Sequence, residues 1–254
     1  QKFQIRHRSI KSLGIQSATY ELKKERMKAK HTKSALIIGA SGLVGKLLLE
    51  AILQKDYYTS ITLVLRRAID LEYDKRVKII TISDFDALDQ YEENLFSEDV
   101  FCCLGSTMKK AGSKSDFEKS DLIYPLKVAI LNQKNPNFKN YLIVTSQGAN
   151  AQSLFYYNQV KGRCEKALLA LNLPGLKIFR PSLLLGNRIE KRRVEVFFNF
   201  LIQVVSSPLK VLGISSFWSI EAAIVARAML QVAMNENEGT VFYDAKAMVQ
   251  LTQK

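Results

Sequence analysis

Hydrophobic and polar positions follow two alternating patterns along the chain. From Ser34 onward, short runs of β-branched and aliphatic residues alternate with longer stretches in which apolar residues recur every three or four positions. Short apolar runs are typical of strands in a parallel sheet, and the longer stretches are typical of the helices that connect them. We predict strands near 34–39, 60–66, 76–82, 99–104, 139–145 and 176–180, and helices near 43–55, 86–95, 114–133, 156–172, 191–206 and 219–234.

This order of elements predicts the fold class. Strands that alternate with helices indicate an α/β protein with a doubly wound parallel sheet, the Rossmann arrangement that binds dinucleotides at the carboxyl ends of its strands. After Arg180 the pattern turns helical, with one further strand candidate at 240–243. We therefore expect residues 34–254 to form a single NAD(P)-binding domain, with a small and mostly helical substrate-side cap at about 182–254.

Composition and length fit this picture. The chain has 254 residues, 47% of them hydrophobic and 24% charged, which suits one globular α/β domain with an appendage. The longest apolar stretch, 194–205, is too short to cross a bilayer, so we predict no transmembrane segment. It would pack on the core or on a second subunit, or lie on a membrane surface.

Few residues are available for metal or triad chemistry. The three cysteines show no metal-ligand spacing, so we expect reduced thiols and an intracellular, cytoplasmic protein. The two histidines, His7 and His31, both precede the first predicted strand. This position argues against a histidine-based metal site and against a Ser-His-Asp triad.

Much of the net charge of +13 lies at the start of the chain. Residues 1–30 contain nine Lys or Arg and two Glu, so we expect a flexible basic arm over 1–33. Such an arm is consistent with an organelle presequence, with a nucleic-acid-binding arm, or with sequence upstream of a start at Met27. We favour the last of these and do not expect nucleic acid as the main partner.

A glycine loop follows the first predicted strand and opens a helix, as a dinucleotide-binding loop does. The glycines would allow a tight exit from the strand, a close approach to a pyrophosphate and packing of the helix on the sheet. The amides of the first helical turn would then face the phosphates. The expected contacts in this loop are Gly39, Ser41, Gly42, Leu43, Val44 and Gly45.

The end of the second strand indicates which nicotinamide cofactor binds. A carboxylate at this place would favour NAD, but the chain carries Arg66 and Arg67, whose guanidiniums suit the 2′-phosphate of NADP(H). A solvated basic strand end is the alternative. Further cofactor contacts are expected after the third, fourth and sixth strands, at Asp84, Phe85, Leu104, Gly105, Ser106, Thr107, Pro181 and Ser182.

A Tyr-x-x-x-Lys spacing marks the predicted chemical centre. It places both side chains on one face of a helix, where the ammonium lowers the phenol pKa and also holds the nicotinamide ribose. Two tyrosines have this spacing, and Tyr20 lies ahead of the glycine loop, whereas Tyr157 and Lys161 open a helix shortly after the fifth strand. Ser146, at the end of that strand, would polarise a substrate carbonyl.

Six segments, taken in their order along the chain, resemble those of a known protein family. They are the glycine loop, the Arg-Arg strand end, 101–107, 145–150, 157–162 and 179–181. Together they resemble the Tat-interacting-protein (CC3-like) branch of the atypical short-chain dehydrogenases/reductases, over about 34–234. The resemblance implies a Rossmann fold, NADPH binding and a catalytic tyrosine at Tyr157 with Lys161 and Ser146 beside it. It also implies members that act as regulators or electron-transfer helpers, and this chain departs from the pattern before Met27 and at 218–221.

These observations favour an NADP(H)-dependent oxidoreductase that moves a hydride to or from a small carbonyl or alcohol, with Tyr157 as acid and base. Two alternatives stay open. One is an NADPH-binding regulatory or interaction protein whose centre is idle, and the other is an enzyme of the nucleotide-sugar epimerase or dehydratase type, because a fold does not fix the reaction. The choice between a homodimer and another protein partner also stays open.

Overall fold

The computed structural model describes residues 33–67, 74–185, 219–235 and 238–253. The segment from Lys33 to the C-terminus groups as one compact unit. The basic arm expected over 1–33 lies almost wholly outside the described residues, and so does the helix expected at 191–206.

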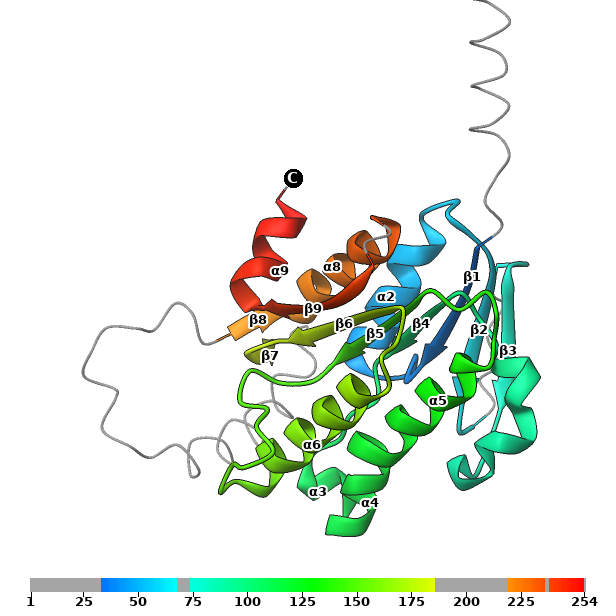
Figure 1. Ribbon diagram of the computed structural model, residues 1–254. Helices are drawn as coiled ribbons and strands as arrows, with labels where there is room; N and C mark the ends of the chain where they lie inside the picture. Colours follow the sequence, from blue (N-terminus) through cyan, green and yellow to red (C-terminus); the bar gives the residue numbers. More distant parts are fainter. Residues whose placement is uncertain (1–32, 68–73, 186–218, 236–237, 254) are drawn as a thin grey trace, which may run out of the picture. The chain divides into compact units, whose positions relative to one another are not determined.

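The described residues form a seven-stranded parallel sheet in the order β3-β2-β1-β4-β5-β6-β9. Figure 1 shows this sheet with helices on both faces, which is the expected doubly wound Rossmann arrangement. Strands β1 to β3 are added toward one edge of the sheet and strands from β4 onward toward the other, so the topological switch point lies between β1 and β4. The strands are β1 (Lys33–Ile38), β2 (Tyr58–Leu65), β3 (Val77–Thr81), β4 (Asp99–Cys102), β5 (Asn140–Val144), β6 (Gly175–Arg180) and β9 (Gly239–Asp244).

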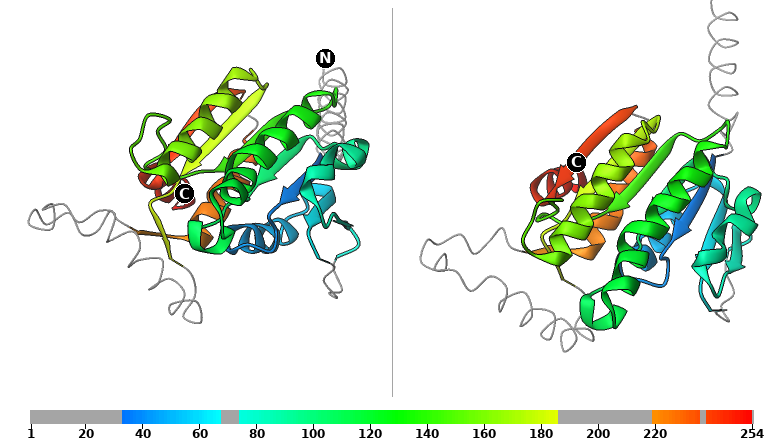
Figure 2. Two further views of the ribbon diagram at one scale, coloured as in Figure 1. Left: turned by 90° about the horizontal axis from the view of Figure 1, so that it is seen from below. Right: turned by 60° about the horizontal axis from the view of Figure 1, so that its bottom comes forward.

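Alternating side chains of the buried strands feed two hydrophobic cores. In β1, Ala35 and Ile37 face one core, and Leu36 and Ile38 face the other. The first core is covered by α2 (Leu43–Leu53) and α8 (Ala222–Met234), with α9 (Ala245–Thr252) packed on α8. The second is covered by the 3₁₀ helix η1 (Phe85–Leu95), α5 (Tyr124–Gln133) and α6 (Tyr156–Ala170). Figure 2 shows α5 and α6 side by side on this face.

The predicted strands are all present, and the candidate at 240–243 is β9. The helix expected at 114–133 is built from three pieces, α4 (Lys114–Glu118), a π-helical turn η2 (Lys119–Ile123) and α5, and a short α3 (Met108–Ala111) precedes it. A small two-stranded sheet of β7 (Leu183–Leu185) and β8 (Ser219–Glu221) was not predicted. Its strands are three residues long, too short to produce a periodic signal.

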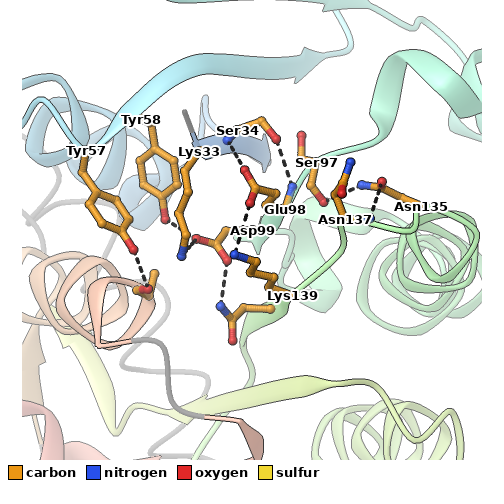
Figure 3. Close-up of polar contacts among 12 residues, drawn as sticks. Lys33, Ser34, Tyr57, Tyr58, Ser97, Glu98, Asp99, Asn135, Asn137 and Lys139 are labelled. Atoms are coloured by element: carbon orange, nitrogen blue, oxygen red, sulfur yellow. Dashed lines mark hydrogen bonds and ion pairs between the residues drawn. The ribbon is translucent and has the colours of Figure 1, made fainter. Parts of the chain in front are cut away.

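A buried polar network ties the amino ends of four strands together (Figure 3). Asp99 is fully buried, and its carboxylate accepts hydrogen bonds of 2.7 Å from the Tyr58 hydroxyl and from the Asn140 amide. Lys33 Nζ lies 3.7 Å from the same carboxylate. Burial raises the pKa of Asp99, while the Asn140 and Tyr58 hydrogen bonds and Lys33 oppose that rise. These contacts cross-link β1, β2, β4 and β5 at the edge of the sheet opposite the glycine loop.

This network predicts a measurable loss of stability. Tyr58→Phe removes the hydroxyl that donates to buried Asp99, so we expect the free energy of unfolding to fall by about 1.5–3 kcal/mol. Tyr156→Phe is the matched control, because that hydroxyl makes an exposed contact of 3.4 Å with the Lys114 carbonyl, and its loss should cost less than about 0.5 kcal/mol. Urea unfolding measures both values, and equal stabilities of the two variants would contradict the prediction.

Candidate functional site

The glycine loop is shaped by a close approach to the loop after β4. Gly39 directly follows β1 and has φ +87°, in a backbone region that residues with side chains rarely adopt. A Cβ on Gly39 would lie 2.6 Å from the carbonyl carbon and oxygen of Cys103. The amide of Gly42 donates a 2.9 Å hydrogen bond to the Gly39 carbonyl. This position therefore admits only glycine, and the two loops lie against each other at the switch point.

Helix α2 starts directly under this loop. A Cβ on Gly45 would lie 2.3 Å from the Gly39 oxygen, so the first turn of α2 can approach only because Gly45 has none. Gly42 is the N-cap, and no side chain caps the helix. The first turn also lacks acidic residues. Its amides and the positive end of the helix dipole are therefore suited to an anion such as a pyrophosphate.

The side chains of this loop divide between surface and core. Ser41 is exposed, Leu43 is half-buried and Val44 is buried in the first core. At the end of β2, the strand next to β1, Arg66 and Arg67 are both exposed. All of these residues lie at the carboxyl edge of the sheet, as the sequence pattern predicted.

Asp84 and Phe85, two of the expected cofactor contacts, lie after β3. Asp84 is exposed and its carboxylate caps η1 by accepting from the Asp86 amide. Phe85, however, is only 5% exposed and packs edge-on against Tyr124, with 5.5 Å between ring centroids. Because its ring is occupied by core packing, we assign Phe85 to the second core and not to the cofactor site.

Other expected cofactor contacts lie at the same edge. After β4, Gly105 is exposed, Leu104 and Ser106 are half-buried, and Thr107 caps α3 by accepting from the Lys110 amide. After β6, Pro181 is buried and its carbonyl accepts from the Gln147 amide at 3.0 Å. This last bond joins the loop after β6 to the loop after β5.

The structure brings the predicted chemical centre together at the start of α6. Tyr157 is partly exposed and its ring packs against Phe117 of α4, with ring centroids 5.5 Å apart. Lys161 lies one helical turn further on, is buried, and acts electrostatically on the Tyr157 phenol. Lys161 forms an ion pair with Asp121 of η2 at 2.7 Å, a partner that sequence reasoning missed.

Two hydroxyls in this region are buried and make no hydrogen bond of acceptable geometry within the described part of the chain, those of Ser146 and Ser182. Ser146 nevertheless lies close enough to Tyr157 to lower the pKa of the phenol. Buried polar groups are normally satisfied, so such groups point to a missing partner. Together with the glycine cradle, these two hydroxyls fit a site for a polar ligand such as a dinucleotide.

Burial is the largest influence on the pKa of Tyr157 in this centre. It raises the pKa of Tyr157, and Asp121 raises it further, whereas Lys161 and Ser146 lower it. Lys161 shows the opposite balance, because burial lowers its pKa but the charges of Asp121 and Tyr157 raise it above the ordinary lysine value. At neutral pH the centre therefore holds a neutral phenol beside a charged ammonium.

A second ion pair, between buried Glu165 and half-buried Arg180, holds α6 against β6. Glu165 accepts from both Nε (3.0 Å) and Nη2 (2.5 Å) of Arg180, and also from the Thr145 hydroxyl at 2.7 Å. The guanidinium of Arg180 also lies 4.4 Å from the centre of the Phe242 ring. The Thr145 side chain thus points to Glu165, which leaves the neighbouring Ser146 for the centre.

The loop between β5 and α6 is seated directly on the helix. A Cβ on Gly162 would lie 2.1 Å from the amide nitrogen of Ala151 and 2.2 Å from the carbonyl carbon of Asn150. The Asn150 amide donates to the Asn158 carbonyl at 3.0 Å. Gly162 therefore fixes the distance between this loop, which contains Ser146, and the helix that carries Tyr157 and Lys161. Its position next to Lys161 is the signal that could have identified it.

Comparisons with known proteins identify relatives and structural neighbours. No family model matches the chain. The chain is 34% identical over 226 residues to Protein HTATIP2 of Rattus norvegicus, covering 86% of this chain and 89% of that protein. It is 29% identical over 226 residues to Protein FMP52-1, mitochondrial, of Scheffersomyces stipitis, covering 87% and 99%.

Solved structures share the fold at low sequence identity. MoeE5 in complex with UDP-glucose and NAD gives a TM-score of 0.60 at 14% identity, over 85% of this chain and 80% of that one. UDP-glucose 4-epimerase of Thermotoga maritima with UDP-glucose gives 0.60 at 14% identity, over 83% and 76%. A short-chain dehydrogenase/reductase superfamily protein of Agrobacterium tumefaciens with bound NAD gives 0.60 at 10% identity, over 84% and 77%. These likenesses establish a Rossmann-type α/β fold.

Within 33–67, 74–185, 219–235 and 238–253, no helix is long and apolar enough to span a bilayer.

The seating of the loop at Gly162 predicts a steric effect. Alanine in a helix interior ordinarily gains about 1 kcal/mol over glycine, but here its methyl group would overlap backbone atoms that cannot rotate away. We expect Gly162→Ala to lower the free energy of unfolding by about 1–3 kcal/mol. Gly148→Ala is the control, because its nearest obstacle is the movable Asn158 side chain, at 2.8 Å. Chemical denaturation decides, and an unimpaired Gly162→Ala variant would contradict the assigned contact.

Proposed function

The chain belongs to the HTATIP2 family, and from that premise we propose that it is an NADP(H)-dependent oxidoreductase of the short-chain dehydrogenase/reductase type. It would move a hydride to or from a carbonyl or alcohol. The observation that carries the proposal is the convergence of Tyr157, Lys161 and the buried Ser146 hydroxyl beside the glycine cradle, at one edge of a Rossmann sheet.

Binding of a nicotinamide dinucleotide is supported by the local chemistry of the glycine loop. The uncapped amino end of α2, next to Gly42, would hold the pyrophosphate. Gly105 and Ser182 would line the path toward the nicotinamide. Structural neighbours such as MoeE5 are described with NAD bound, which supports a dinucleotide as the ligand of this fold.

The choice of NADP(H) rests on the end of β2. Arg66 and Arg67 are exposed there, where a carboxylate would otherwise bind the adenosine ribose and repel a 2′-phosphate. A guanidinium binds a phosphate through two parallel charge-assisted hydrogen bonds. We therefore propose that these two arginines select the phosphorylated cofactor.

Three residues of the chain would carry out the proton transfer and position the substrate and the cofactor. When bound, the cofactor supplies or accepts the hydride at the substrate carbon. Tyr157 donates its phenolic proton to the carbonyl oxygen in reduction and takes it back in oxidation. The Ser146 hydroxyl donates a hydrogen bond to the same oxygen, and Lys161 holds the nicotinamide ribose.

For the cellular compartment, we propose an intracellular location. The three cysteines are free in the structure, as expected for reducing surroundings. The cytoplasm expected from the sequence and the mitochondrion in the names of the fungal relatives both satisfy this condition.

The role of Tyr157 is testable by removal of its hydroxyl. Tyr157→Phe should lower the rate of NADPH-dependent reduction across a panel of small aldehydes and ketones by at least about a hundredfold, because the proton donor is lost. NADPH affinity, measured by calorimetry, should stay within a few fold. Tyr156→Phe, one residue earlier on α6, is the control. Unchanged turnover by Tyr157→Phe would reject the assigned role, and cofactor binding without any turnover by the wild type would favour a regulatory binding protein.

The cofactor preference is testable at the two arginines. Replacing Arg66 and Arg67 together by alanine should weaken NADPH binding by about tenfold to a hundredfold, because charge-assisted hydrogen bonds to the 2′-phosphate are lost. NADH binding should change little. Arg227→Ala, at an exposed arginine on α8, is the matched control. Equal losses for NADPH and NADH would contradict selection by these arginines.

A further inference from the structure

A buried ion pair lies at the core of the candidate centre. Lys161 Nζ and Asp121 Oδ1 are 2.7 Å apart, with side chains only 6% and 0% exposed. The other carboxylate oxygen, Oδ2, accepts from the Ser106 amide at 2.9 Å and from the Ser120 hydroxyl at 2.5 Å. Three partners therefore hold the carboxylate of Asp121 in one place.

The backbone places Asp121 there by a local irregularity. Lys119–Ile123 form a π-helical turn between α4 and α5, and such turns insert an extra residue and often occur at functional sites. The pair lies directly beneath the exposed Gly105, where a Cβ would be 3.5 Å from Lys161 Nζ and 3.6 Å from Asp121 Oδ1. The Lys161 ammonium is thus held next to Gly105 by the carboxylate of Asp121, which belongs to η2.

Two buried thiols interact with this pair and are neutral. Cys164 of α6 acts on Lys161, Lys161 acts on Cys102 of β4, and burial raises the pKa of each thiol. Among the described residues that act on Tyr157, Lys161 carries the positive charge and Asp121 the negative one. The phenol therefore faces an ion pair with little net charge, and not a bare ammonium.

We propose that Asp121 is a positioning residue of this centre: it fixes the Lys161 ammonium beneath Gly105 and neutralises it, so that Tyr157 keeps its proton. This inference rests on the proposed function for its meaning. A protonated phenol is the form that carbonyl reduction needs, whereas alcohol oxidation needs the phenolate. The centre is accordingly set to reduce carbonyls at neutral pH, and its oxidation reaction requires a higher pH.

The experiment reads the phenol directly, without cofactor or substrate. The full chain is labelled with ¹³Cζ-tyrosine, the Tyr157 resonance is assigned with Tyr157→Phe, and its ionisation is followed by NMR up to the pH at which the fold opens. Asp121→Asn should shift the Tyr157 midpoint down by about one pH unit or more, because the ammonium then acts unopposed. Lys161→Gln should shift it up.

The double variant Asp121→Asn/Lys161→Gln completes the cycle. It has no buried charge to leave unpaired, so it remains informative even where a single variant fails to fold. Because the two charges offset each other, its Tyr157 midpoint should return close to that of the wild type. Glu118→Gln is the matched control, since it removes an exposed ion pair of 2.6 Å, with Arg163, between α4 and α6 and should leave Tyr157 unchanged.

Two outcomes would overturn the proposal. The first is that the ionisation midpoint of Tyr157 in Asp121→Asn is no lower than the pH at which Tyr157 of the wild type ionises or the wild type unfolds. The other is a double variant whose midpoint stays shifted from that of the wild type. Neither outcome depends on catalysis, so a failure here is distinct from a failure to bind NADPH or to turn over a carbonyl.

Discussion

The approach of two backbone loops at the switch point of the sheet is the constraint on which the candidate site depends. Parallel pairing of β1 with β4 brings the end of β1 against Cys103, with room there only for a glycine. The same Gly39 carbonyl limits Gly45, so the start of α2 is fixed by the same crowding. A methyl group at Gly39 or Gly45 would push α2 and the loop after β4 apart. The amino end of α2, where we propose that the pyrophosphate binds, and the exposed Gly105 are thus positioned by one packing contact.

Buried charges on α6 organise the other half of the site. Lys161 and Glu165 lie one turn apart on the buried face of this helix, and each is paired with a different element, η2 through Asp121 and β6 through Arg180. Removing Asp121 or Arg180 would leave Lys161 or Glu165 as an uncompensated buried charge, which is more costly than the pair itself is stabilising. The two pairs therefore specify the rotation of α6 about its axis, and hence the direction of the Tyr157 ring, more than they add to overall stability.

Much of the fold and part of the site were predictable because their signals are local and periodic. The strands, the glycine loop and the Tyr157–Lys161 spacing can each be recognised from a few adjacent residues. The position of the glycine loop after the first strand identified it as a dinucleotide-binding loop. Asp121 was not predictable, because a single carboxylate in an amphipathic helical segment looks like a solvent-exposed residue, and only the π-helical turn carries it inside. Phe85 was expected to contact the cofactor because it follows a strand, but its ring is buried in the second core.

The electrostatics of the centre follow from these positions more than from the residue types. The Tyr-x-x-x-Lys spacing alone predicts an ammonium that lowers the pKa of the phenol, and Lys161 does act in that direction. Burial and Asp121 act against it, and their combined effect is larger, so the phenol pKa ends above its ordinary value. A sequence motif can thus identify the groups that meet, while the sign of their net effect depends on a third residue brought in by the fold. Because Asp121 is also bonded to the Ser106 amide, a ligand that moves the loop at Gly105 would act on the carboxylate, and through it on the proton of Tyr157.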